Sequence, residues 1–211
     1  MKRIIKNAEP EDFVRWKATY PAARYVDLGN ERSFPGAAVA KRALRASLKM
    51  EQKGLCCYCE SKIVSNDFHI EHFRPKDPAK FPELQLEYSN LHASCHAEPI
   101  GGSDECCGHN KKNEFNNDLI SPLEADCESH FEYDTMGGIK GIDRRGEETI
   151  RILHLDSSLL NASRKRLIEY FEDLEDDDFD EEIARHLDET GATLGEFFTT
   201  IDFLYGKNLL R

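Results

Sequence analysis

The stretch FHIEHFRP, residues 68–75, decides the fold, because a short apolar strand ends in reactive side chains. Its β-prone composition predicts a strand over residues 68–73. Glu71 and His72 stand next to each other near the end of this strand. A carboxylate offers oxygen to a hard divalent cation, and a histidine with a pKa near neutrality can deprotonate water. These two residues are therefore the first candidates for a catalytic site.

The cysteines are concentrated around this strand, with only one of the seven lying outside the central part of the chain. Cys56 and Cys59 have the C-x-x-C spacing that aims two thiolates at one tetrahedral ion. Cys95 stands alone, and its partner must be Cys106 or Cys107. We favour Cys107, because Cys107, Gly108 and His109 adjoin a following helix that we expect to carry a ligand of a catalytic ion. Four thiolates leave no open position for water, so zinc bound here would be structural; buried thiols without a metal are the alternative.

Two further residues complete the candidate site. Asn90, in YSNL, supplies an amide that can pin a loop near the base, and His109, in GHNKK, supplies a second ligand for a catalytic ion. Such an ion would stabilise charge on phosphoryl oxygens, and Lys111 or Lys112 could approach the phosphate. Hydrolysis of a phosphodiester therefore fits these groups jointly, although each residue taken alone is more often structural.

The charge of the chain permits contact with nucleic acid without predicting it. The formal net charge of -12 is unusual for such a protein, because phosphate contacts need Lys and Arg. Residues 172–189 hold eleven acids against the single Arg185, so the rest of the chain is close to neutral. We see no apolar run near the roughly eighteen residues of a membrane span and no export signal. A cytoplasmic protein is therefore expected.

We expect an α+β fold in three segments: helical residues 1–53, a core with the metal and catalytic residues at 54–117, and a mostly helical region at 118–211. Helices are predicted over residues 9–18, 37–53, 156–172 and 193–205, with one more in the acidic stretch. Leu159, Leu160, Leu167 and Ile168 are the predicted core stripe of the third of these helices. β-prone runs occur at 61–64 and 149–155, and a hairpin or turn is predicted at 133–142.

The order of these motifs resembles that of a known family. C-x-x-C, IEHFRP, YSNLxxSC and CGHxK follow one another as in the zinc-bearing branch of the HNH, or ββα-metal, endonucleases. The resemblance implies a ββα-metal core in which His72 is the general base and Asn90 orients it. It also implies that Glu71 and His109 bind the catalytic Mg²⁺ or Mn²⁺.

The resemblance continues beyond these motifs, through residues 122–128, 133–139 and 148–155. This longer pattern is similar to the HNH subunits (PtuB) of Septu anti-phage systems and their retron-associated relatives. It implies a bacterial defence nuclease that acts on nucleic acid together with an ATPase subunit (PtuA-like). DNA and RNA remain equally open as substrates, because the motif recognises phosphate.

Two points stay open on the sequence alone. Asn110 or Asn113 could replace His109 as the last ligand of the catalytic ion. A function of a different class is a zinc-bound interaction module whose nuclease site is inert and whose acidic helices recruit a partner.

Overall fold

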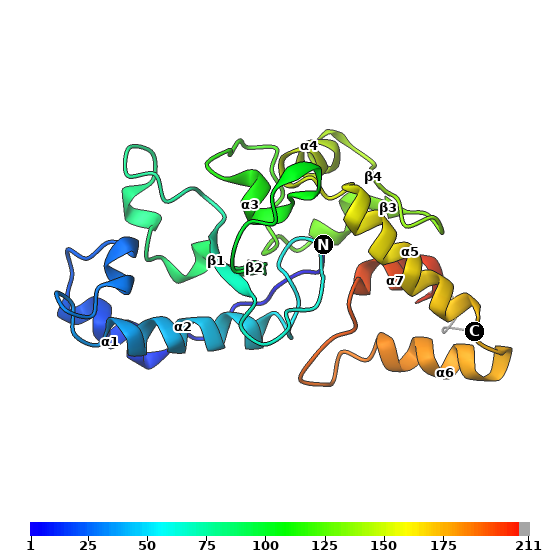
Figure 1. The fold of residues 1–211 in the computed structure, drawn as a ribbon, viewed down its shortest axis with the longest axis horizontal. Helices are drawn as coiled ribbons and strands as arrows, with labels where there is room; N and C mark the ends of the chain where they lie inside the picture. Colours follow the sequence, from blue (N-terminus) through cyan, green and yellow to red (C-terminus); the bar gives the residue numbers. More distant parts are fainter. Residues whose placement is uncertain (207–211) are drawn as a thin grey trace.

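The structure is a computed structural model that describes residues 1–206, apart from the side chains of Asp176 and Asp177; residues 207–211 of the predicted C-terminal segment lie outside the described residues. The α-helices are α1 (Glu11–Thr19), α2 (Ala37–Glu51), α3 (Cys107–Lys111), α4 (Arg144–Leu153), α5 (Ser158–Glu172), α6 (Asp176–His186) and α7 (Phe198–Tyr205). The strands are β1 (Phe68–His72), β2 (Leu91–Cys95), β3 (Phe131–Tyr133) and β4 (Ile139–Gly141). Helices combined with two small sheets make the described part an α+β fold, as predicted (Figure 1).

Short 3₁₀ helices connect these elements. They are η1 (Tyr25–Gly29), η2 (Pro82–Leu84), η3 (Tyr88–Asn90), η4 (Gly102–Asp104) and η5 (Cys127–His130). Two of them matter for the site. Helix η1 leads from α1 toward α2, and η3 leads directly into β2.

The hairpin of β1 and β2 positions the site. The two strands are antiparallel, with Phe68 opposite Cys95 and Glu71 opposite His92. Side chains alternate between the two faces of a strand. Phe68 and Ile70 therefore pack in the apolar cluster that α2 also enters, while Glu71 and His92 belong to the other face. The hairpin thus separates an apolar face, which packs against α2, from a polar face.

The N-terminal helices cover the apolar face of the hairpin. Its apolar cluster includes Phe13 and Trp16 from α1, Leu28 from η1, Leu44 and Leu48 from α2, and Leu91 from β2. The side chain of Glu31 accepts the backbone N–H groups of Gly36 and Ala38 at 2.8 and 2.7 Å, at the start of α2. A carboxylate at this end also complements the helix dipole. The helix predicted over residues 37–53 is therefore present, and it ends at Glu51.

The strand predicted over residues 149–155 is wrong, because most of this segment belongs to helix α4. The side chain of Asp143 accepts the Gly146 N–H at 2.8 Å and so caps the helix. Ile152 and Leu153 are 1% and 0% exposed, buried along one side of the helix. The cap and this burial outweigh the β propensity of the isoleucines, which depends on context.

The other strand predictions had mixed outcomes. The hairpin predicted at 133–142 is confirmed by the antiparallel pairing of β3 with β4. The run at 61–64 forms only an isolated bridge, between Lys62 and Leu55. Strand β2, whose sequence LHASC has weak β propensity, was not predicted; its pairing with β1 stabilises it.

Helices α5, α6 and α7 complete the fold around a separate apolar cluster that contains Ile168, Phe171, Ile183 and Ile201. Of the core stripe predicted for α5, Leu160 and Ile168 are buried and Leu167 is partly buried. Leu159 is 42% exposed, so its prediction is wrong. Adjacent residues lie about 100° apart on a helix, and here only Leu160 of the pair faces the core. Within residues 1–206, no helix is long and apolar enough to cross a membrane.

Candidate functional site

The cysteine cluster consists of Cys56, Cys59, Cys95 and Cys107, whose sulfur atoms all lie within 4.8 Å of one another. The Sγ atoms are 3.8 Å apart in the pair Cys56 and Cys107 and also in the pair Cys59 and Cys95. A tetrahedron with zinc–sulfur bonds of about 2.3 Å has edges of about 3.8 Å. The cluster, buried on all four residues, therefore has the size and chemistry to hold a tetrahedral metal ion.

Three separate segments bring these thiols together. The first two stand in the turn between α2 and β1, Cys95 ends β2, and Cys107 begins α3. The backbone N–H of Cys95 donates to the Cys56 sulfur at 3.3 Å, as expected for a supported metal thiolate. Cys107 adopts a left-handed φ of 56°, which aims its side chain differently from that of the preceding Cys106. Cys106 is buried as well, yet the group of four includes Cys107 and not Cys106.

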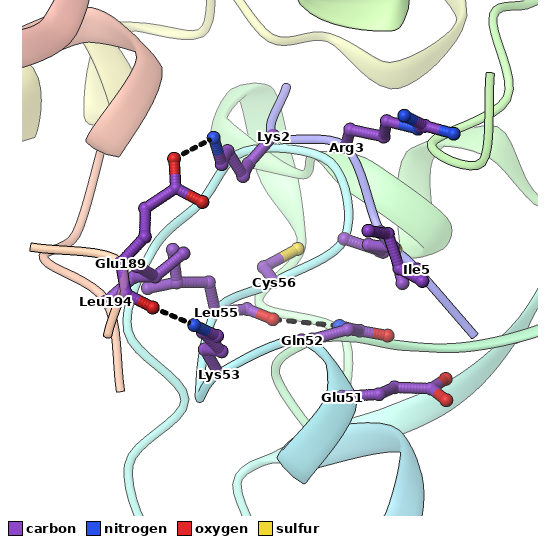
Figure 2. A pocket seen from close by; sticks show the side chains of 12 residues that line it. Lys2, Arg3, Ile5, Glu51, Gln52, Lys53, Leu55, Cys56, Glu189 and Leu194 are labelled. Atoms are coloured by element: carbon purple, nitrogen blue, oxygen red, sulfur yellow. Dashed lines mark hydrogen bonds and ion pairs between the residues drawn. The ribbon is translucent and has the colours of Figure 1, made fainter. Parts of the chain in front are cut away.

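The N-terminal segment covers one side of this cluster. Figure 2 shows the Cys56 side chain beside a cavity of about 180 Å³, lined by Lys2 and Arg3 on one side and by residues at the end of α2 on the other. The ammonium of Lys2 forms an ion pair with Glu189 at 2.7 Å, which links the N-terminal segment to the loop after α6. The cluster is therefore enclosed by segments that are distant in sequence.

Glu71 lies next to the cluster, on the polar face of β1. Its Oε1 atom forms an ion pair with the Lys111 ammonium at 2.9 Å and accepts a hydrogen bond from the Tyr58 hydroxyl at 3.2 Å. Its Oε2 atom lies 3.5 Å from Nε2 of His69. Burial alone would raise the pKa of Glu71, but the charge of Lys111 and the hydrogen bond to His69 lower it to about 2. Glu71 is therefore an ionised carboxylate, with Oε2 directed toward an imidazole.

One backbone carbonyl orients two histidines beside Glu71. The oxygen of His96 lies 2.9 Å from Nδ1 of His69 and 3.0 Å from Nε2 of His109. A carbonyl only accepts hydrogen bonds, so each of these nitrogens carries a proton. Burial lowers the pKa of His69, but the hydrogen bonds to Glu71 and to the His96 carbonyl raise it above the ordinary value, so Nε2 also carries a proton when it faces the ionised carboxylate. A metal ion bound here would replace this proton, because a metal ligand uses the lone pair of Nε2. The centroids of the His69 and His109 rings are 4.0 Å apart. His96 itself has a left-handed φ of 61°, a conformation that non-glycine residues adopt uncommonly.

Glycine is required at position 108, between these groups. A Cβ atom there would lie 2.4 Å from Nε2 of His69 and 2.5 Å from Oε2 of Glu71. Both distances are far below van der Waals contact. Gly108 therefore leaves free the space that the imidazole and the carboxylate face together.

His72 enters the same pocket from the end of β1. Its Nε2 atom lies 3.0 Å from the carbonyl oxygen of Gln85, so this nitrogen carries the proton and Nδ1 keeps the lone pair. The Tyr25 ring packs edge-on against the imidazole at 4.4 Å. Burial lowers the pKa of His72 to about 4. His72 is therefore a neutral imidazole with an available basic nitrogen.

Asn90 acts on the loop that holds His72. Its Oδ1 atom accepts the Arg74 N–H at 2.7 Å, and its Nδ2 atom donates to the carbonyls of Arg74 and Leu84 at 2.9 and 3.1 Å. These bonds fix the two ends of the loop between β1 and Gln85. Asn90 thus supports the position of His72 through the backbone of the loop. None of these hydrogen bonds reaches the His72 ring.

Glu71 and the histidines His69, His72 and His109 line one pocket of about 380 Å³. Its lining consists of Tyr25, His69, Ile70, Glu71, His72, Pro75, Lys76, Pro99, Gly108, His109, Lys112 and Asn113. Lys111 is 1% exposed and donates inward to the His72 carbonyl at 2.8 Å, so only Lys112 of the lysine pair lines the pocket. Asn110 points away and donates to the Ile152 carbonyl at 2.9 Å. His109 and Asn113 remain at the pocket as possible ligands.

The sequence reasoning overlooked His69, Gly108 and the His96 carbonyl. A signal for His69 was present, because residues two apart on a strand share a face, and His69 stands two residues before Glu71. His92 is a different case: it is fully buried and both its ring nitrogens lack a hydrogen-bond partner within the described residues. Burial lowers its pKa well below the ordinary value, so His92 is neutral.

A closed thiolate cluster beside an open pocket with an acid, imidazoles and a neutral histidine is the arrangement of a metal-dependent hydrolase with a separate structural metal. The chain is similar to retron-encoded HNH endonucleases and to the Septu protein PtuB. It is 36% identical over 137 residues to a Vibrio cholerae protein named "Retron Vc95 putative HNH endonuclease". The matched region covers 61% of the chain and 65% of that relative, slightly less than two thirds of its length.

Two further relatives are also a retron HNH endonuclease and a Septu protein. A retron Ec83 protein of Escherichia coli with the same description is 26% identical over 212 positions, which cover 81% of the chain and 80% of the relative. Septu protein PtuB of Bacillus thuringiensis is 29% identical over 122 residues, which cover 55% of the chain and 42% of the relative. No protein-family model matches the chain.

Proposed function

We propose that this protein is a metal-dependent HNH endonuclease that hydrolyses phosphodiester bonds of nucleic acid in bacterial anti-phage defence. The observation that carries the proposal is the pocket in which the neutral His72 lies beside the ionised Glu71 and the imidazole of His69. The similarity of the chain to retron HNH endonucleases and to PtuB supports the same reaction class.

The pocket residues fit a divalent cation. Oε2 of Glu71 and Nε2 of His69 face the space above Gly108, and His109 stands beside them. Carboxylate and imidazole are ligands for Mg²⁺ or Mn²⁺, and Mg²⁺ is usually held by one or two carboxylates with water and phosphate completing the shell. An ion bound here would stabilise negative charge on the phosphoryl and leaving oxygens. His69 is thus added to the predicted ligands Glu71 and His109.

His72 accepts the proton of the attacking water, and Lys112 contacts the phosphate. Nδ1 of His72 accepts a proton from the attacking water, whose oxygen forms the new bond to phosphorus while the bond to the leaving oxygen breaks. The leaving oxygen takes up a proton from solvent, and His72 returns its proton to solvent, so one water is consumed and the products are a phosphate monoester end and a hydroxyl end. Lys112, at the pocket wall, pairs with a phosphate oxygen. Asn90 holds the loop that keeps His72 in place.

Zinc in the cysteine cluster would be structural. All four ligand positions are filled by thiolates, so the metal offers no site for water or substrate. The cluster joins the turn after α2, the end of β2 and the start of α3; α3 lines the pocket, and β2 pairs with β1, which also lines it. We further propose that an ATPase subunit of the PtuA type acts with the chain, by analogy with its Septu relative.

The test compares wild type with His72→Ala on duplex DNA, single-stranded DNA and tRNA, with Mg²⁺ or Mn²⁺. Each reaction is run with the chain alone and with a PtuA-type ATPase subunit. We expect His72→Ala to lower cleavage at least about 100-fold, the scale of a lost general base. His130→Ala, which removes an imidazole paired with Asp143 outside the pocket, is the control.

Equal cleavage by wild type and His72→Ala would refute the proposal. Phage protection that survives His72→Ala and disappears with Cys59→Ser would instead favour the zinc-bound interaction module.

A further inference from the structure

Helix α2 carries a row of cations on one side. Lys41, Arg42, Arg45 and Lys49 stand at spacings that place them along neighbouring turns of the helix. All four line a groove of about 500 Å³, whose lining also includes small residues such as Gly29, Ala38 and Ala46. None of the described residues that line the groove is acidic.

The row is not neutralised. Among the ion pairs of the described residues, none involves any of these four side chains. Arg45 donates to the carbonyls of Asn66 and Phe68, both at 2.9 Å, and Lys49 donates to the Ser65 carbonyl at 2.7 Å. In a chain with a net charge of -12, a groove with cations and no acids is a local exception.

Two elements, β1 and η1, contribute residues both to the groove and to the catalytic pocket. On β1, Phe68 lines the groove and Ile70 lines the pocket. A strand rises about 3.3 Å per residue, so these two positions are about 7 Å apart. On η1, Leu28 lines the groove and Tyr25 lines the pocket. The Lys76 ammonium lies 4.8 Å from the centroid of the Tyr25 ring, so the pocket also has a cation on the side of η1.

We propose that the α2 groove binds the phosphodiester backbone of the substrate next to the bond that is cut; this inference rests on the proposed nuclease function. Lys and Arg recognise backbone phosphates without reading sequence, and such contacts set the register of a strand on a protein. The small side chains at the groove allow a backbone to approach closely. The phosphates beyond the scissile one thus pair with Lys41, Arg42 and Lys49. Lys49 donates one proton to the Ser65 carbonyl and has two ammonium protons left, whereas Arg45 is held by two carbonyl bonds.

The acidic helix α6 does not oppose this assignment. Figure 1 places α6 at the other end of the molecule from α1 and the start of α2. Its acids therefore lie away from the entrance of the groove, and salt screens charges beyond about 8 Å at physiological ionic strength.

The experiment uses the full chain with the triple change Lys41→Gln, Arg42→Gln and Lys49→Gln. A matched control, Lys140→Gln, Lys165→Gln and Arg166→Gln, removes the same charge from β4 and α5, which Figure 1 places on the opposite side of the hairpin from α1. Binding of labelled duplex and single-stranded DNA and RNA is measured without divalent metal at several salt concentrations. Cleavage of the same nucleic acids and of bis(p-nitrophenyl) phosphate, which is too small to reach the groove, is then measured with Mn²⁺.

We expect the α2 triple variant to bind nucleic acid at least tenfold more weakly. The slope of log affinity against log salt should fall by about 2 for single strands and about 3 for duplexes, because each of the three lost contacts contributes about 0.7 to 0.9. The α5 and β4 control should keep the wild-type slope, and both variants should hydrolyse the small phosphodiester at the wild-type rate. The substrate that loses most affinity identifies the preferred backbone.

Wild-type affinity and salt slope in the α2 variant would overturn the groove proposal while leaving the nuclease intact. So would a variant that loses self-association instead of nucleic-acid binding, because the groove would then receive the acidic helix of a second copy. Failure of the wild type to cleave any substrate, the small diester included, refutes the proposed function itself.

Discussion

The cysteine cluster and the pocket meet at helix α3 and differ in how many metal ligands the protein provides. Helix α3 contributes Cys107 to the cluster and Gly108 and His109 to the pocket, whereas β2 contributes only to the cluster and β1 only to the pocket. The cluster is closed: four buried thiols face one another at metal-binding distance. The pocket is open: Oε2 of Glu71 and Nε2 of His69 face a cavity of about 380 Å³. One site provides every ligand of its ion, and the other leaves positions for water and substrate.

This difference has an energetic counterpart. A site that provides all ligands couples metal binding to folding, because the unfolded chain has no preformed site. A site that leaves positions open has to hold its charges by other means before substrate binds, and here Lys111 and Tyr58 neutralise and hold Oε1 of Glu71. Variants of the cluster should therefore affect stability, and variants of the pocket should affect metal binding and rate.

The largest effect is expected for Cys107→Ser. Loss of one thiolate should release the metal, whose contribution is on the order of 10 kcal/mol in structural zinc sites and thus as large as the stability of a whole domain. The cooperative thermal transition should disappear. Cys106→Ser, one residue away and outside the group of four, is the control and should retain one zinc per chain. Zinc content by elemental analysis and thermal unfolding by circular dichroism check both, and zinc retained by Cys107→Ser would assign the fourth ligand elsewhere.

An intermediate effect is expected for Lys111→Met, which removes a buried cation behind the pocket wall. Lys111 and Glu71 form a buried ion pair, and removal of one partner leaves an uncompensated charge. The free energy of unfolding should fall by about 3 kcal/mol, measured by urea unfolding in the absence of divalent ions.

The neighbouring exposed lysine provides the control for this change. Lys112→Met should alter the free energy of unfolding by less than about 0.5 kcal/mol, as for most surface changes. Equal effects of the two lysine variants would mean that the buried pair contributes nothing specific.

The smallest effect on stability is expected for Gly108→Ala. The new methyl group would force His69 and Glu71 apart, but alanine also favours a helix over glycine by about 1 kcal/mol. We therefore expect a near-unchanged melting temperature together with about tenfold weaker Mn²⁺ binding, measured by calorimetry. Gly29→Ala, where nothing lies within 4 Å of the added Cβ, should leave Mn²⁺ binding unchanged. Unaltered binding in Gly108→Ala would remove His69 from the ligand set.

The sequence alone predicted the candidate metal-binding and catalytic residues because spacing along one strand or one turn is local. C-x-x-C and the adjacent Glu71 and His72 are neighbours in the chain, so their proximity needs no tertiary information. Helix α2 was predictable for the same reason: its apolar periodicity and its flanking glycines are local signals. The same local signals failed at α4, where the Asp143 cap and burial outweighed propensity.

Only the tertiary structure decided how these groups face one another. Cys107 joins Cys56 through a left-handed backbone conformation that a sequence pattern does not encode. The carbonyl of His96 orients two imidazoles, and any residue type at that position has the same carbonyl. The α2 groove likewise depends on η1 and β1 packing beside the helix. Residue types determined which reactions are possible, whereas the packing of distant segments determined which atoms point into the pocket and which stay buried.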